Sequence, residues 1–214
     1  MTTHTPLRAA RAAGHGPKVD IRSVHLDDPL VRPLIAELAS EYSQRYSDLL
    51  TEEDLRAELA QYPAVEFEPP HGELLLAIVD DLPVSGGAFR RRHEPELGES
   101  ARLRTPHVRD GEGRPAVPTA ELKRIWTHST YRRQGWSRRV LAELERRAAF
   151  VGYERIYLTT GPRQPEAAAL YLSEGYTPLF DPDDRPTEGG LAFEKWLSEP
   201  AFVRTAASQG ADGS

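Results

Sequence analysis

Residues 132–137, which read Arg-Arg-Gln-Gly-Trp-Ser, combine basic side chains with a glycine just ahead of an amphipathic stretch. If a strand enters this turn and a helix leaves it, the first amides of the helix lack partners and the helix dipole adds positive potential. Such a turn can hold a phosphate or diphosphate through main-chain N–H groups, and Gly135 keeps a Cβ out of the anion's path. The turn therefore predicts an anion site, although a solvated basic helix start would give the same pattern if the turn stood alone.

The segments on either side of this turn have the periodicity that an anion site requires. Residues 120–127 predict a strand, and residues 135–151 predict a helix whose apolar residues share one face. The chain then predicts a strand at 155–160, a short helix at 165–173, and two strands near 176–180 and 191–196. The turn thus lies where a strand meets a helix.

The N-terminal half predicts more strands and helices of the same sheet. They are a strand at 19–24, a helix over 31–46, a second short helix capped by Thr51, and strands at 74–79 and 84–90. The last two form a hairpin, in which Gly86 and Gly87 indicate a bulge or a close approach of backbone. Alternating strands and helices of this kind predict an α/β fold with a mixed sheet.

The turn also matches the acyl-CoA-binding signature Q/R-x-x-G-x-G/A, and the order of elements resembles the GNAT N-acetyltransferase superfamily across most of the domain. Arg132 fits the first position and Gly135 the central glycine, whereas Ser137 replaces the usual Gly or Ala and Trp136 is bulkier than the common aliphatic residue. The resemblance implies the GNAT fold, a mixed central sheet flanked by helices. It also implies that the turn binds acetyl-CoA through Arg132, Arg133, Gln134, Gly135, Trp136 and Ser137.

A second match covers residues 168–176, where a Leu-Tyr pair precedes Gly-aromatic as in the late helix of that family. The resemblance implies that Tyr171 lies beside the thioester sulfur. A phenol with a reference pKa of about 10 is protonated at neutral pH and can give its proton to a leaving thiolate. The alternative is that Tyr171 is only an aromatic residue of the hydrophobic core. Gln164 stands where the family often has an Asn that binds the pantetheine arm, and this chain has no Asn.

The strand before the turn supplies the other implied catalytic groups. Glu121 has the position of a general base in several family members, and a base is needed because an amine with a reference pKa of about 10.4 is protonated at pH 7. The alternatives are a chain of water molecules, or a Glu121 that only pairs with Lys123 or an arginine. The resemblance further implies that main-chain amides at Ile125, Trp126 and Thr127 polarise the thioester carbonyl.

Other charged residues give weaker signals. The seven histidines show no metal-ligand spacing, so no metal site is expected. Residues Arg90, Arg91 and Arg92 alternate along a predicted strand, which separates their charges onto two faces. One of them is a candidate partner for a substrate carboxylate.

Composition sets the limits of these predictions. The chain has 214 residues, 39% of them hydrophobic, a net charge of −6 and no cysteine, so disulfides and thiolate chemistry are excluded and nucleic acid is not an expected partner. No apolar run suits a membrane span or a signal peptide, and a cytoplasmic protein is expected. We expect disordered tails at 1–17 and 200–214, and one domain at 18–199 with a long loop at 94–118.

The predicted function is transfer of the acetyl group of acetyl-CoA to an amine of a small molecule or peptide. The alternatives are a non-catalytic acyl-CoA-binding regulatory module and an acyltransferase for longer acyl-CoAs. A dinucleotide-binding fold is excluded because no G-x-G-x-x-G follows a strand. The identity of the amine and the presence of a homodimer stay open.

Overall fold

A computed structural model describes residues 18–48, 51, 53, 57, 61–92 and 118–197. The strands in this part of the chain are β1 (Val19–Ser23), β2 (Glu73–Val79), β3 (Leu82–Arg91), β4 (Thr119–Thr127), β5 (Arg155–Thr160), β6 (Thr177–Pro178) and β7 (Leu191–Trp196). The α-helices are α1 (Arg32–Tyr46), α3 (Trp136–Phe150) and α4 (Pro165–Ser173), with short 3-10 turns at Pro29–Val31, Ala64–Phe67 and Ser129–Tyr131. Most of the predicted helix after Thr51, both predicted tails and nearly all of the predicted loop lie outside the described residues.

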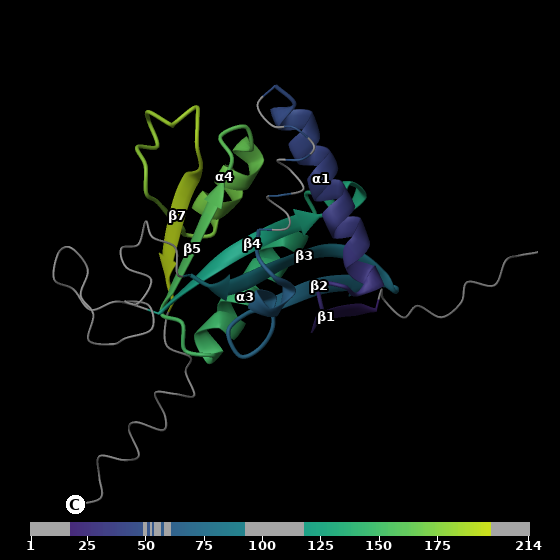
Figure 1. The fold of residues 1–214 in the computed structure, drawn as a ribbon. Coiled ribbons are helices and arrows are strands. Elements are labelled where there is room, and N and C mark those ends of the chain that lie inside the picture. Colours follow the sequence, from purple (N-terminus) through teal and green to yellow (C-terminus); the bar gives the residue numbers. More distant parts are fainter. Residues whose placement is uncertain are drawn as a thin grey trace, which may run out of the picture.

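The strands form a seven-stranded mixed sheet in the order β1-β2-β3-β4-β5-β7-β6, with α1 and α3 on opposite faces (Figure 1). The predicted mixed α/β fold is therefore confirmed. The predicted hairpin is also confirmed, and its turn consists of Asp80 and Asp81, both with positive φ. This backbone matches the twist of two-residue hairpins. The strand predicted at 176–180 is only Thr177–Pro178, although the N–H of Leu179 still donates to the carbonyl oxygen of Ala192 at 2.9 Å.

A bulge interrupts β4 opposite the glycine pair of β3. Gly86 pairs with Trp126, and Ala88 pairs with Lys123. These pairs are two residues apart in β3 but three residues apart in β4, so the extra residue belongs to β4. A Cβ on Gly86 would lie 2.8 Å from the carbonyl oxygen of Leu75 in β2, which explains the glycine at this position. The predicted close approach is confirmed, and the irregularity that the glycines indicated lies in the partner strand.

Strands β4 and β5 separate after a short parallel pairing. They pair only over Thr119–Glu121 and Arg155–Tyr157, and β5 then continues beside β7. Beyond Glu121, the described part of β4 therefore has β3 as its one neighbour in the sheet. The two strands diverge in Figure 1, and the gap between their carboxyl ends opens toward α1, α3 and α4.

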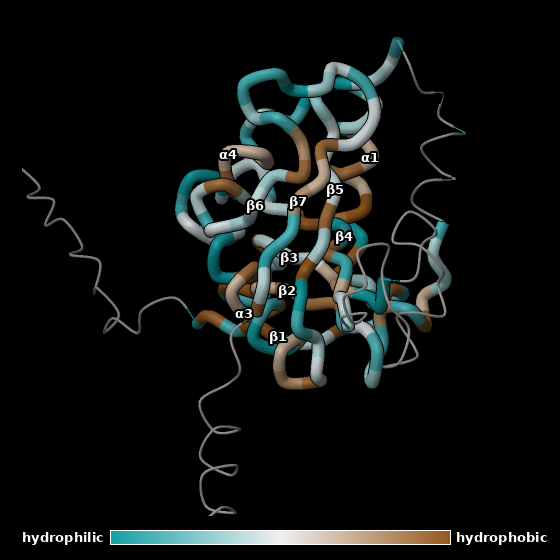
Figure 2. The backbone as a smooth tube through the Cα atoms, turned by 90° about the vertical axis from the view of Figure 1, so that its left-hand side faces the viewer, coloured by the Kyte–Doolittle hydropathy of each residue, from teal (hydrophilic) through white to brown (hydrophobic). Residues whose placement is uncertain are grey.

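The two faces of the sheet carry separate hydrophobic cores. On one face, α3 buries Val140, Leu141 and Leu144 against the central strands. On the other, α1 buries Leu34 and Leu38 together with Trp126 of β4 and others. Figure 2 shows that the hydrophobic stretches of backbone gather along these central strands. Burial on both faces fixes β4, so the residues at its end are held in place from two sides.

Candidate active site

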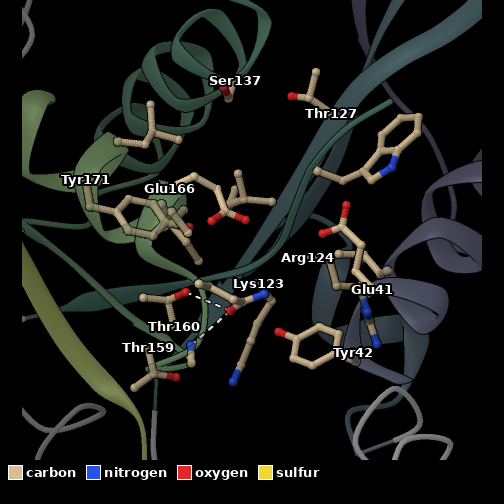
Figure 3. Close-up of a pocket in the computed structure, with 18 of the residues that line it drawn as sticks. Glu41, Tyr42, Lys123, Arg124, Thr127, Ser137, Thr159, Thr160, Glu166 and Tyr171 are labelled. Atoms are coloured by element: carbon tan, nitrogen blue, oxygen red, sulfur yellow. Dashed lines mark hydrogen bonds between the residues drawn. The ribbon is translucent and has the colours of Figure 1, made fainter. Parts of the chain in front are cut away.

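A cavity of about 1270 Å³ fills the gap between β4 and β5. Its walls come from α1, the end of β4, the turn before α3, the end of β5 and α4 (Figure 3). Most of the predicted site residues line it, namely Ile125, Trp126, Thr127, Arg132, Arg133, Gly135, Trp136, Ser137, Gln164 and Tyr171. Gln134 and Glu121 are predicted site residues that the described lining does not include.

The turn at 132–137 has the backbone that an anion site needs. Gly135 caps the 15-residue helix α3 with a φ of 80°, a left-handed conformation that side chains with a Cβ rarely adopt. No heavy atom lies within 4 Å of the position that its Cβ would take. The start of α3 is thus open, and its unpaired amides and dipole can attract a phosphate.

The basic side chains at this turn have different surroundings. Arg132 donates from Nε to the carbonyl oxygen of Thr127 at 3.1 Å and forms an ion pair with Glu41 of α1. Arg133 is exposed and has no ion-pair partner among the described residues. The turn therefore offers one guanidinium held by a carboxylate and one exposed arginine that also lines the cavity.

The remaining turn residues have structural contacts. Gln134 donates from Nε2 to the carbonyl oxygen of Thr130 at 3.2 Å, which steadies the turn from outside the cavity. Trp136 packs into the core on the α3 face, and the Arg139 guanidinium lies 4.8 Å from its ring centre. The large side chain of Trp136 is thus buried in the core beneath the turn.

Trp126 anchors the end of β4 to α1. Its Nε1 donates to Oε2 of Glu37 at 2.8 Å, and Glu37 also accepts from the hydroxyl of Ser129 at 3.1 Å. Burial raises the pKa of Glu37, but the hydrogen bonds from Trp126 and Ser129 outweigh it and hold the pKa below its usual range. Glu37 and Glu41 were not among the predicted site residues, although their spacing of four places both on one face of a helix.

Tyr171 projects from α4 into the cavity (Figure 3). It is 5% exposed, and its ring packs against Tyr176 and Phe193 with centroid distances of 5.5 and 5.7 Å. Within the described residues its hydroxyl has no hydrogen-bond partner. Burial raises the pKa of Tyr171 above its usual value, so the phenol stays protonated at neutral pH. A held, protonated phenol with an unused donor is suited to giving a proton to a ligand in the cavity.

Gln164 is oriented by two hydrogen bonds at the start of α4. Its Oε1 accepts from the Thr160 hydroxyl and from the N–H of Gly161, each at 2.9 Å (Figure 3). Because Oε1 is occupied by these donors, the amide Nε2 is the group left to donate. The side chain can therefore hold a carbonyl in the cavity.

Glu121 lies behind the cavity wall in a group that we call the charge cluster: Arg90, Arg92, Glu121 and Lys123. The carboxylate is 2% exposed and lies 2.6 Å from Arg90, 3.1 Å from Arg92 and 3.0 Å from Lys123. Arg90 and Arg92 are buried on the same face of β3, while Arg91 points to the other face and contacts His71. The alternation is as predicted, and the expected alternative that Glu121 pairs with Lys123 or an arginine agrees with these contacts, but it was not predicted that both arginines would reach Glu121.

The described residues show no group of three His, Cys, Asp or Glu side chains that could hold a metal ion. In the same part of the chain, every helix is too short or too polar to cross a bilayer.

Comparison with known proteins shows which family the sequence matches. Residues 35–176 match the acetyltransferase (GNAT) family. No curated protein matches the sequence.

Solved structures share the fold at low sequence identity. An acetyltransferase from Streptococcus agalactiae is 14% identical, with a TM-score of 0.55 over 84% of this chain and 98% of that one. A GNAT-family acetyltransferase from Staphylococcus aureus is 15% identical, with a TM-score of 0.54 over 84% and 100%. PaiA N-acetyltransferase from Thermoplasma acidophilum, solved with coenzyme A, is 13% identical, with a TM-score of 0.51 over 84% and 99%.

The family match covers strands β2 to β5, most of the cavity lining and both motifs, and the fold of these structures agrees with it. The chain belongs to the acetyltransferase (GNAT) family.

Proposed function

We propose that the protein transfers the acetyl group of acetyl-CoA to an amine of a small molecule or peptide by direct attack. The observation that carries this proposal is a single cavity lined by both the open turn of α3 and the protonated phenol of Tyr171. A phosphate-binding end and a proton donor in one cavity are what acyl transfer from a coenzyme A thioester requires.

The cofactor-binding residues follow from the geometry of the turn. The amides at the start of α3 hold the diphosphate, assisted by Arg132 and Arg133, while Gly135 leaves room for its approach. Gln164 donates from Nε2 to a carbonyl of the pantetheine arm. Acetyl-CoA supplies the activated acyl group as a thioester. Main-chain N–H groups of Ile125, Trp126 and Thr127 polarise its carbonyl.

Proton transfers then accompany the exchange of bonds. The amine nitrogen forms a bond to the carbonyl carbon as the carbon–sulfur bond breaks. The acceptor, an ammonium at neutral pH, first loses one proton through water to Glu121. As the neutral nitrogen attacks, Tyr171 gives its proton to the departing sulfur, and the second proton of the nitrogen is released to water. Water is needed because Lys123, and not Glu121, lines the cavity. The net products are an amide and a free thiol.

A thiol-release assay with acetyl-CoA and a panel of amines, beside calorimetric titration of coenzyme A, tests this proposal. Binding together with release on at least one amine class supports it. Binding without release across the panel favours the regulatory module, and release only with longer acyl-CoAs favours the third alternative. Failure to bind coenzyme A overturns the assignment of the turn.

A further inference from the structure

The last turn of α1 is joined to the loop between β5 and α4. Arg45 donates from Nη1 to the carbonyl oxygen of Arg163, and Arg163 donates from Nη1 to the carbonyl oxygen of Arg45, each at 2.8 Å. Arg45 also forms an ion pair with Glu166 at the start of α4. The two arginines are 118 residues apart in the sequence, so these contacts hold the end of α1 against the β5 side of the cavity.

Tyr46 is the buried member of this contact. It is 7% exposed, it lines the cavity, and its hydroxyl oxygen accepts from the main-chain N–H of Arg163 at 3.2 Å. The guanidinium of Arg163 instead pairs with Asp48 on the outside, where the two side chains are 41% and 59% exposed. Exposed ion pairs contribute little to stability, so the Tyr46 hydroxyl is the group that holds the loop from within.

Gly161 shows how closely this hydroxyl approaches the loop. A Cβ on Gly161 would lie 1.9 Å from the hydroxyl oxygen of Tyr46 and 3.3 Å from Oε1 of Gln164. The backbone of Gly161 does not have a positive φ, so its conformation would accept other residues and the glycine is explained by space alone. The Tyr46 hydroxyl and the Gln164 amide oxygen therefore lie on the same side of Gly161.

Gln164 is oriented by the same short loop. Its Oε1 accepts from the N–H of Gly161 and the hydroxyl of Thr160, and its own main-chain N–H donates to the carbonyl oxygen of Gly161 at 3.0 Å (Figure 3). Tyr46 binds the N–H of Arg163, which lies between Gly161 and Gln164 in the chain. A donor that is already held in its binding orientation loses less freedom when a ligand binds, which raises affinity.

We infer that Tyr46 is a positioning residue for the pantetheine arm of coenzyme A: its hydroxyl fixes the loop that directs Nε2 of Gln164 into the cavity. The inference rests on the proposed function and adds a residue of α1 to the cofactor site. Tyr46 acts through Gln164, so its contribution to affinity disappears when the Nε2 donor is absent. The end of α1 thus takes part in binding the cofactor as well as in forming the cavity wall.

The test compares the binding of coenzyme A with that of 3′-phospho-ADP, which is coenzyme A without its pantetheine arm. Both ligands carry the diphosphate for the turn before α3, so the ratio of their affinities reports on the arm. For the wild type we expect coenzyme A to bind about tenfold more tightly. Tyr46→Phe should weaken coenzyme A about fivefold, as for the loss of one hydrogen bond, and leave 3′-phospho-ADP unchanged. Calorimetric titration measures both affinities.

A double-mutant cycle tests whether Tyr46 acts through Gln164. Gln164→Glu keeps an acceptor for Thr160 and Gly161 but removes the Nε2 donor. In that background Tyr46→Phe should have no further effect on the ratio, whereas additive effects overturn the positioning role. Gly161→Ala, which crowds both the hydroxyl and Oε1, should lower the ratio as Tyr46→Phe does. It provides the same test if Tyr46→Phe does not fold.

Tyr153→Phe is the matched control. Tyr153 is 6% exposed and donates its hydroxyl to the carbonyl oxygen of His71 at 2.7 Å, and it is not among the described residues that line the cavity. This variant should lower thermal stability and leave the affinity ratio unchanged. Asp48→Asn, which removes the outer ion pair of Arg163, should leave the ratio unchanged as well.

The outcomes separate this inference from the proposed function. An equal loss of affinity for both ligands with Tyr46→Phe assigns the hydroxyl to stability and overturns the inference, and so does an unchanged affinity for coenzyme A. Equal binding of the two ligands by the wild type overturns it while the assignment of the turn stands. Binding of neither ligand overturns the proposed function and this inference with it.

Discussion

The two ends of the cavity are built in different ways. At the α3 end, six consecutive residues supply an open backbone, a left-handed glycine and two guanidinium groups. At the other end, the charge cluster assembles side chains from β3 and β4, which are separated in the sequence by the residues between Arg91 and Thr119. The first end uses main-chain groups that any sequence with this turn can provide. The second depends on particular side chains, so it is the end at which members of one fold can differ in acceptor.

The largest effect is expected from breaking the charge cluster. Glu121→Gln removes the buried carboxylate that Arg90, Arg92 and Lys123 share, although Arg90 keeps its ion pair with Glu66, and breaking a buried ion pair costs about 3–5 kcal/mol of unfolding free energy. Urea unfolding at pH 7 measures this loss.

A matched control is Asp20→Asn, which removes an ion pair with Arg22 in which the two side chains are 47% and 53% exposed. It should cost only about 0.5 kcal/mol because such pairs lie near solvent. Equal losses in the two variants would contradict the difference that we draw between the buried cluster and the surface.

Changing the proton donor should affect turnover alone. Tyr171→Phe keeps the ring that packs against Tyr176 and Phe193 but removes the hydroxyl. We expect kcat to fall about 100-fold, as for the loss of a general acid, with the affinity for coenzyme A unchanged. Steady-state kinetics and calorimetry together measure both quantities. An unchanged kcat would show that Tyr171 serves only as a core aromatic.

Changing the turn should lower the affinity for coenzyme A in addition to any loss of stability. Gly135→Val forces a β-branched side chain into a φ of 80° at the open start of α3, and we expect coenzyme A to bind about tenfold more weakly. Gly152→Val is the control, since Gly152 also has a positive φ and open space but lies beyond the other end of α3. It should lower thermal stability without changing affinity. A similar loss of affinity in both variants would assign the effect to strain in α3.

The smallest effect concerns the contact between α1 and the turn. Glu41→Gln removes the carboxylate that pairs with Arg132, so the guanidinium is free to meet a diphosphate. We expect coenzyme A to bind about threefold more tightly, in keeping with a partly exposed ion pair. Asp48→Asn, which frees Arg163 instead, should leave the affinity unchanged. Weaker binding by Glu41→Gln would mean that the carboxylate orients Arg132 for its ligand.

The sequence predicts the α3 end of the cavity better than the other end. The turn at 132–137 and the helix with Tyr171 each depend on neighbouring residues, so periodicity and a family signature locate them. The alternation of Arg90 and Arg92 was also predictable. It was not predictable that both arginines would be buried against Glu121, because their pairing depends on the register between β3 and β4.

The contacts of Glu37 and Glu41 could not be predicted from the sequence either. Both are charged residues on a helix, and a solvated face is the usual interpretation of such residues. Only the packing of α1 across the end of β4 brings them to Trp126 and Arg132. Long-range pairs of this kind leave no local pattern in the sequence.

The bulge in β4 makes a one-residue deletion an informative change. In an ordinary strand, losing one residue turns every following side chain to the opposite face. Here β4 already carries one residue more than β3 opposite Gly87, so removing Arg124 would restore plain alternation. Ile125 would still face α3 and Trp126 would still face α1. The deletion would keep both cores and straighten the backbone beside the cavity, but it would also remove the Arg124 guanidinium, which lines the cavity and lies 4.3 Å from the Phe67 ring centre. Comparison with Arg124→Ala, which keeps the bulge, therefore separates the contribution of main-chain direction from that of the side chain.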